Sequence, residues 1–283
     1  MRVPFLRRSF RSIFAPSRLY SDLTERTMNR ARSLISIVGG LLMCAATMHA
    51  QTRDALIDIS FDVEPGSWFV GLATGYSSNF HTGGFRAVPG REDVPVLEDG
   101  RGGGFQIGVV AEYLLSRYFM LDGRVVYDMR AGHFERSWPD TLILLGSGER
   151  RPGDTTGRAD VAYRLVTTDL LLSGRLGRIS EDLAFTLSAG PSFGLIVGTE
   201  VDQWVERTDG TGARSYSSTD RSIAAHNELR LAFKAGGGLE WQAADRLWVN
   251  ARAVYELGIT DVTESENWQL DALLFQLDLL IAL

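Results

Sequence analysis

The stretch Leu273-Leu274-Phe275-Gln276-Leu277-Asp278-Leu279-Leu280-Ile281-Ala282-Leu283 decides the fold. Every second residue from Leu273 to Leu283 is apolar, while Gln276, Asp278 and Ala282 fall on the other face. Because side chains alternate between the two faces of a strand, this period of two predicts a β-strand with one apolar face.

The same alternation recurs along the chain in segments of about 12 to 15 residues, which suits tilted strands that cross a membrane. We identify eight such segments: 67–80, 105–115, 119–130, 162–176, 183–197, 228–241, 246–257 and 272–283. The long polar links between them are 81–102, 131–160, 198–227 and the shorter 259–268, and the tight turns are 116–117, 178–182 and 243–245. Residues 66–283 are therefore predicted to form an all-β, eight-stranded antiparallel up-and-down transmembrane β-barrel with short periplasmic turns and long extracellular loops.

Charged residues recur on the polar face of these segments, which would line the inside of the barrel. The predicted interior holds seven cations and seven anions: Arg124, Arg130, Arg175, Arg230, Lys234, Arg246 and Arg252 with Glu112, Asp122, Asp128, Asp169, Glu240, Glu256 and Asp278. A ring of about eight strands is only wide enough for side chains to fill, and unpaired buried charge is costly. We expect an ion-pair plug and a barrel that does not conduct.

A soluble lipocalin-like barrel that carries an apolar ligand is the structural alternative, because it also alternates but places its apolar face inside. Two features favour the membrane barrel. The strands are long, and aromatic residues such as Trp68, Tyr76, Phe119 and Trp241 lie near strand ends on the apolar face, as interfacial girdles do.

The N-terminal part has the pattern of an export signal. Residues 28–50 combine a basic head, an apolar centre that is too short for a membrane anchor and Ala50 before Gln51, which predicts a signal peptide cleaved after Ala50. Residues 1–27 are expected to be an over-extended start or a leader. Residues 51–65 are expected to be a periplasmic lead-in, although alternation within 54–63 also permits a further strand.

Composition limits the function. The formal net charge is −6, but residues 1–50 hold eight Arg against Asp22 and Glu25, so the rest of the chain carries about −12. A body that acidic is a poor nucleic-acid binder, because phosphate contacts need clustered Lys and Arg. The single cysteine, Cys44, lies in the predicted signal peptide, which leaves no thiol chemistry for the mature chain.

Glycine-punctuated motifs resemble one known family. The runs Gly102–Phe105, Ala189–Gly194, Ala235–Glu240 and Tyr255–Val262 are similar to those of PorT-like, OmpA-like outer-membrane β-barrel proteins of Bacteroidetes and related bacteria. The resemblance spans residues 66–283 and implies an eight-stranded barrel in the bacterial outer membrane. Most members have no assigned activity, and some are tied to secretion or gliding. Leu283 departs from the aromatic C-terminus that is common in such barrels.

Catalysis is the functional alternative, because some small outer-membrane barrels are lipid-modifying hydrolases that pair a His with a Ser and an acid. The candidates are His81 with Ser78, His133, and His226 with Ser222 and Glu228. No nucleophile-elbow or metal-spacing motif accompanies them, so we expect no catalytic residue, metal or cofactor.

Binding is the preferred interpretation, because recognition usually resides in loops on a rigid scaffold. Trp138 and Trp204 lie among charged residues in the predicted loops and are the recognition candidates; alternatively, the strands continue as paired hairpins and these Trp residues pack together. The sequence thus predicts a non-enzymatic barrel with a structural, adhesive or secretion-accessory role. Its expected partners are outer-membrane lipid, the barrel assembly machinery and an unidentified extracellular or envelope protein.

Overall fold

A computed structural model describes residues 63–85, 96–144, 150–209, 214–221, 227–263 and 267–283. These residues all fall within one compact unit, Asp58–Leu283. The predicted leader 1–27, the signal peptide 28–50 and residues 51–62 of the lead-in lie outside the described residues. No helix in the described part of the chain is long and apolar enough to cross a membrane.

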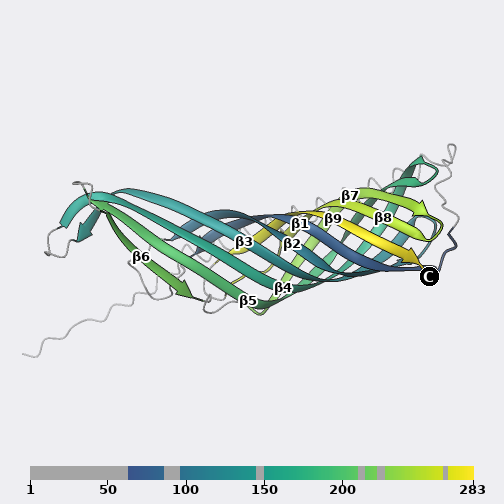
Figure 1. Ribbon diagram of the computed structural model, residues 1–283, viewed down its shortest axis with the longest axis horizontal. Helices are drawn as coiled ribbons and strands as arrows, with labels where there is room; N and C mark the ends of the chain where they lie inside the picture. Colours follow the sequence, from purple (N-terminus) through teal and green to yellow (C-terminus); the bar gives the residue numbers. More distant parts are fainter. Residues whose placement is uncertain (1–62, 86–95, 145–149, 210–213, 222–226, 264–266) are drawn as a thin grey trace, which may run out of the picture. The chain divides into compact units, whose positions relative to one another are not determined.

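The described chain forms nine strands in one antiparallel sheet (Figure 1). Their bounds are β1 Trp68–Phe85, β2 Leu97–Leu114, β3 Phe119–Leu144, β4 Arg150–Ser180, β5 Leu183–Asp209, β6 Arg214–Arg221, β7 Leu229–Ala244, β8 Leu247–Gly258 and β9 Gln269–Ala282.

Eight of these strands close into a ring. Neighbouring strands pair in the order β1-β2-β3-β4-β5-β7-β8-β9, and β9 pairs back onto β1, with Val70 opposite Ile281 and Leu72 opposite Leu279. The strand β6 pairs with the outer part of β5 and stands outside this ring. The predicted eight-stranded up-and-down barrel is confirmed.

Apolar side chains cover the outside of the ring and charged side chains its inside. On β3 the outward residues Phe119, Leu121, Val125, Tyr127 and Met129 are exposed, whereas the alternating inward positions are buried. We call this band of outward apolar residues on the eight ring strands the apolar belt. On β3 it spans residues 119–129, a length that matches one membrane crossing by a strand. Apolar outside and charged inside is the reverse of a lipocalin.

Short turns join the strands at one end, as predicted. In the turn between β2 and β3, the amide N–H groups of Tyr118 and Phe119 donate to the Ser116 hydroxyl at 3.2 and 3.1 Å. Before β1, the amide and hydroxyl of Ser67 both donate to the Glu64 carbonyl, and Gly66 has a positive φ of 96°. Pro65 and Gly66 therefore form a turn that precedes the first strand.

Strands replace much of the predicted loops at the other end. Residues 131–144 and 150–160 continue β3 and β4, and 198–209 continue β5 and pair with β6. Figure 1 shows β3, β4 and β5 running on together with β6 beside β5. We call this four-stranded part, residues 131–144, 150–160, 198–209 and 214–221, the outer extension. It forms because inward positions such as Phe134, Ala159 and Val201 are still apolar and bury one another.

Two local irregularities modify the strand pattern in β5. Arg164 pairs with Gly198 but Leu165 pairs with Ile196, so Val197 is an extra residue that reverses which β5 side chains face inward. At Gly190 and Pro191 the ladder with β4 is interrupted for two residues without a change of register. Pro191 therefore weakens the pairing locally and makes no bulge there.

The full chain, extracted in detergent, is expected to be heat-modifiable: boiled and unboiled samples should differ in gel mobility, and the unboiled sample should be rich in β-structure by far-UV circular dichroism. The closed ring explains this, because no strand edge of the ring is open to detergent. A monomer that folds and stays soluble without detergent would contradict the assigned inside and outside.

Candidate functional site

Ion pairs cross the interior from one wall of the ring to the other. Arg130 on β3 contacts Glu256 on β8 at 2.6 Å, although three strands separate β3 from β8 around the ring. The same Glu256 contacts Arg230 at 2.5 Å and Lys234 at 3.3 Å, and Lys234 reaches Asp169 on β4 at 2.7 Å. These residues, with Asp128 bound to Arg130, form a group of three cations and three anions. We call it the upper group, because it lies nearer to the outer extension than the other ion pairs do.

A lower group is centred on Arg252 of β8. Its guanidinium contacts Glu112 on β2 at 2.6 Å and Asp278 on β9 at 3.1 Å, and it also pairs with Asp122 on β3. Arg124 pairs with Asp278, so this group holds two cations and three anions. Neutral donors complete it: Asn250 donates to Glu112 at 2.9 Å and Ser173 donates to Asp122 at 2.6 Å.

A third pair, Arg175 of β4 with Glu240 of β7 at 2.6 Å, lies at the short-turn end. The Arg175 guanidinium also stacks over the Trp248 ring, 5.8 Å from its centroid. Thirteen of the fourteen predicted interior charges are thus buried and engaged in ion pairs.

The prediction for Arg246 is wrong. This residue lies in the turn between β7 and β8 and is exposed, because inward alternation on β8 begins only at Trp248. The predicted segment 246–257 begins one residue too early, inside the tight turn. Without Arg246, the predicted set holds six cations against seven anions, and the extra acid belongs to the lower group.

Two apolar clusters inside the ring, which the sequence pattern does not predict, flank the ion pairs, and the Arg175–Glu240 pair lies at the level of the second one. We call them the outer plug and the inner plug. The outer plug is Leu97, Phe134, Ala159, Val161, Tyr163, Leu165, Ile196, Val201, Val262, Trp268 and Leu270. The inner plug is Phe69, Ala73, Val110, Leu114, Met120, Val126, Ala184, Trp248 and Leu280, with Val63 packed against it. The sequence signal that could have indicated these plugs is the presence of aromatic residues at inward positions, near the ends of the polar faces of the strands.

Aromatic rings pack tightly in both plugs. In the outer plug, Phe134 and Trp268 meet edge to face at 5.5 Å, and His81 lies 5.3 Å from Phe134 and 5.6 Å from Trp268. In the inner plug, Phe69 and Trp248 meet edge to face at 5.6 Å. Such contacts stabilise a packed interior.

The candidate catalytic groups do not assemble. His81 is 1% exposed and points inward, whereas Ser78 lies on the outward face of the same strand, so the two are on opposite sides of the wall. His133 faces outward and contacts Asp160 at 2.6 Å, while Ser137, two positions further along that face, bonds to Thr156. His226 and Ser222 lie outside the described residues, and Glu228 is exposed.

The two candidate Trp residues lie in the outer extension on opposite faces of its sheet. Trp138 pairs with the inward Thr155 and packs against the outer plug, and Arg136 stacks over its ring at 5.5 Å. Trp204 pairs with the outward Arg158 and is half-buried. The hairpin alternative is therefore right about the paired strands, but it does not bring the two Trp residues to the same face.

Comparison with known proteins identifies a family. Residues 50–264 match the family model described as outer membrane protein beta-barrel domain. No curated protein sequence matches. Similar solved structures include Ail, the attachment invasion locus protein of Yersinia pestis, at 12% identity and TM-score 0.27, covering 78% of this chain and all of that one. Another is Neisserial surface protein A, at 12% identity and TM-score 0.30, covering 75% of this chain and 95% of that one. At such scores these structures add no functional argument.

Replacing Glu256 by Gln removes the carboxylate that Arg130, Arg230 and Lys234 share, and leaves these three buried cations facing only two carboxylates, Asp128 and Asp169. We expect a loss of about 3–5 kcal/mol in the free energy of unfolding, measured by urea denaturation in detergent micelles. The matched control is Glu135→Gln on the exposed face of β3, whose carboxylate contacts Arg158 at 3.1 Å. It should cost less than about 1 kcal/mol. Equal losses in the two variants would contradict the buried network.

Proposed function

Since the chain belongs to the outer membrane protein beta-barrel domain family, and is therefore a bacterial outer-membrane protein, we propose that it is a non-enzymatic barrel with a closed lumen. Its working surface is the outer extension, which serves a structural, adhesive or secretion-accessory role by binding an extended segment of another envelope or extracellular protein. One observation carries this proposal: side chains fill the interior of the ring, whereas β3, β4, β5 and β6 form a long paired extension beyond it.

The filled interior supports a barrel that does not conduct. The upper and lower groups of ion pairs join β3 to β8 across the lumen, and the two apolar plugs pack beside them. An ion that entered would have to displace packed aromatic rings and then break buried charge pairs, each of which is costly to separate. Transport through the lumen is therefore disfavoured.

The outer extension supports a binding role because one of its edges is open. Among the described strands, β6 pairs with β5 alone. Open edges present unpaired N–H and C=O groups, and proteins usually blunt them with charge or proline. The β6 sequence RSYSSTDR carries neither between Ser215 and Thr219. An extended peptide could add there as a further strand, with main-chain hydrogen bonds giving affinity.

The hydrolase alternative has weaker support. Its serine candidate Ser78 faces away from His81, and the exposed His133–Asp160 pair has no serine beside it among the described residues. A His–Asp pair without a nucleophile within hydrogen-bond reach is an ordinary surface ion pair.

Export and assembly complete the proposal. Residues 28–50 act as a cleaved signal peptide, and the outer-membrane barrel assembly machinery inserts the eight-stranded ring into lipid. The resemblance of the glycine motifs to PorT-like barrels favours an accessory role in secretion among the three roles named above.

The purified full chain in planar lipid bilayers is expected to show no steady single-channel current. The aromatic plugs and the cross-lumen ion pairs leave no hydrated path. Steady current through the unmodified protein would overturn the closed lumen.

The edge of β6 can be tested with two neighbouring proline variants, Ser217→Pro and Ser218→Pro. Successive N–H groups point to opposite sides of a strand, so one proline removes a donor facing β5 and the other a donor facing the open edge. With a photo-crosslinker at Tyr216 in intact cells, we expect a protein adduct that the edge-facing proline reduces most. An adduct that persists equally in both variants, with unchanged heat-modifiability, would contradict strand addition at β6.

A further inference from the structure

The apolar belt contains a hollow of about 880 Å³ on its outward face. Two cross-strand rows of outward residues form it. One row is Ile281, Val70, Ala111, Gly123 and Leu170, on β9, β1, β2, β3 and β4. The next row is Leu72, Val109, Val125, Thr168 and Phe193, on β1 to β5.

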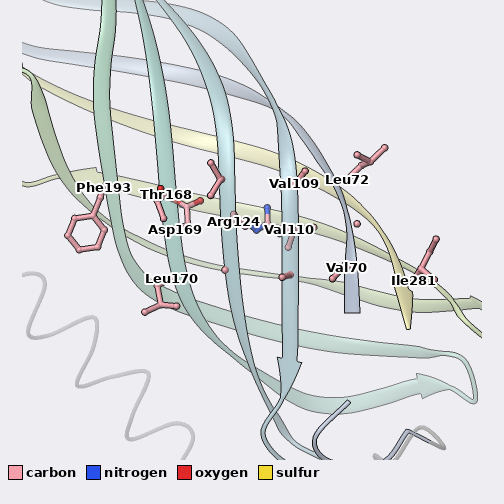
Figure 2. A pocket seen from close by; sticks show the side chains of 14 residues that line it. Val70, Leu72, Val109, Val110, Arg124, Thr168, Asp169, Leu170, Phe193 and Ile281 are labelled. Atoms are coloured by element: carbon pink, nitrogen blue, oxygen red, sulfur yellow. The ribbon is translucent and has the colours of Figure 1, made fainter. Parts of the chain in front are cut away.

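Side-chain size explains the hollow. The middle of the rows carries Ala111, Gly123 and small β-branched residues, whereas the flanks carry Leu72, Leu170 and Phe193. Figure 2 shows Leu72 and Ile281 on one side of the hollow and Leu170 and Phe193 on the other. The outward side chains are therefore short in the middle of the hollow and long on both of its sides.

The glycine at the centre is not required by the backbone. A Cβ atom built on Gly123 would meet only the Ala111 carbonyl oxygen, at 3.9 Å, which is ordinary contact distance. Gly123 is also absent from the residues with positive φ. A glycine in a strand interior weakens the strand, and it often marks a place where another molecule approaches closely.

The position of the hollow indicates what fills it. It lies in the middle of the apolar belt, four residues from Phe119 on β3, and is continuous with the surface that faces lipid. Its outward lining is apolar apart from the Thr168 hydroxyl. Hydrocarbon is the only material in that environment that matches such a lining.

A cation lies below the hollow at the short-turn end. Arg117, in the turn between β2 and β3, is exposed and makes no ion pair with a described residue. Leu115 is four residue steps along the chain from Ala111, so the hollow lies about 13 Å from this turn. A lipid whose phosphate meets Arg117 could place the middle of an acyl chain over Gly123.

We propose that this hollow is a binding site for one acyl chain of a phospholipid from the periplasmic leaflet, with Arg117 contacting its phosphate. The site is distinct from the lumen and from the outer extension, so its failure would leave the proposed function untouched.

The test is native mass spectrometry of the full chain extracted from outer membranes in mild detergent, with fragmentation to identify any retained lipid. We expect a monomer that retains one phospholipid. Gly123→Leu should lower the lipid-bound fraction about tenfold or more, because its side chain enters the hollow. Arg117→Ala should lower it severalfold.

Two control variants separate this effect from loss of folding or from added belt area. Gly177→Leu also replaces a strand glycine whose Cβ would meet nothing within 4 Å, but it lies outside the hollow. Ala253→Leu enlarges an outward residue of β8, also outside the hollow. Both should retain the phospholipid, and all variants should stay heat-modifiable. A bare monomer, a dimer without lipid, retained lipopolysaccharide in place of phospholipid, or equal loss in Gly123→Leu and the controls would each overturn the proposal.

Discussion

The pairing of β9 with β1 is the contact on which the rest of the structure depends. In hydrocarbon no water can satisfy a backbone N–H or C=O group, so a sheet that crosses the membrane must leave no edge. Closing the ring directs every second side chain into the lumen. The buried charges on those side chains need partners, and they find them across the lumen, from β3 to β8, or two strands along the wall, from β4 to β7.

The interior is layered along its length. Aromatic and aliphatic side chains concentrate toward both ends, and most of the charged residues lie between them, while the Arg175–Glu240 pair lies beside Trp248 at the short-turn end. This order suits the surroundings, because ion pairs are screened and weakened where water reaches them. The charged residues between apolar contacts such as Phe69 with Trp248 and Phe134 with Trp268 are buried, and a buried ion pair acts at a lower effective dielectric than an exposed one. The lower group, with three acids around two Arg residues, is the least balanced part of this arrangement.

Alternation in the sequence was sufficient to predict the ring, its eight strands and the burial of residues such as Asp122, Lys234 and Glu256. It could not assign partners, because which side chains meet across the lumen depends on the stagger of the strands, and a period of two carries no information about stagger. Alternation also places Arg246 inside the ring, wrongly, because a two-residue turn does not interrupt the alternation of polar and apolar residues clearly enough to mark where the strand begins. The outer extension was mistaken for loops because its outward face is charged and its inward face is only intermittently apolar. The bulge at Val197 also interrupts the alternation in the sequence, because the residues that face inward change from one set of alternate positions to the other along β5.

The change of partner along β5 has an evolutionary consequence. Its first half pairs with β7 inside the ring, and its second half pairs with β6 outside it, with the bulge at Val197 between them. Residues beyond the bulge contribute nothing to the stagger that closes the barrel. Insertions, deletions or exchanged hairpins there can alter the exposed surface without re-registering the membrane-embedded wall. The fold thus separates an anchor, whose strand register closes the ring, from an extension whose length and sequence are free of that constraint.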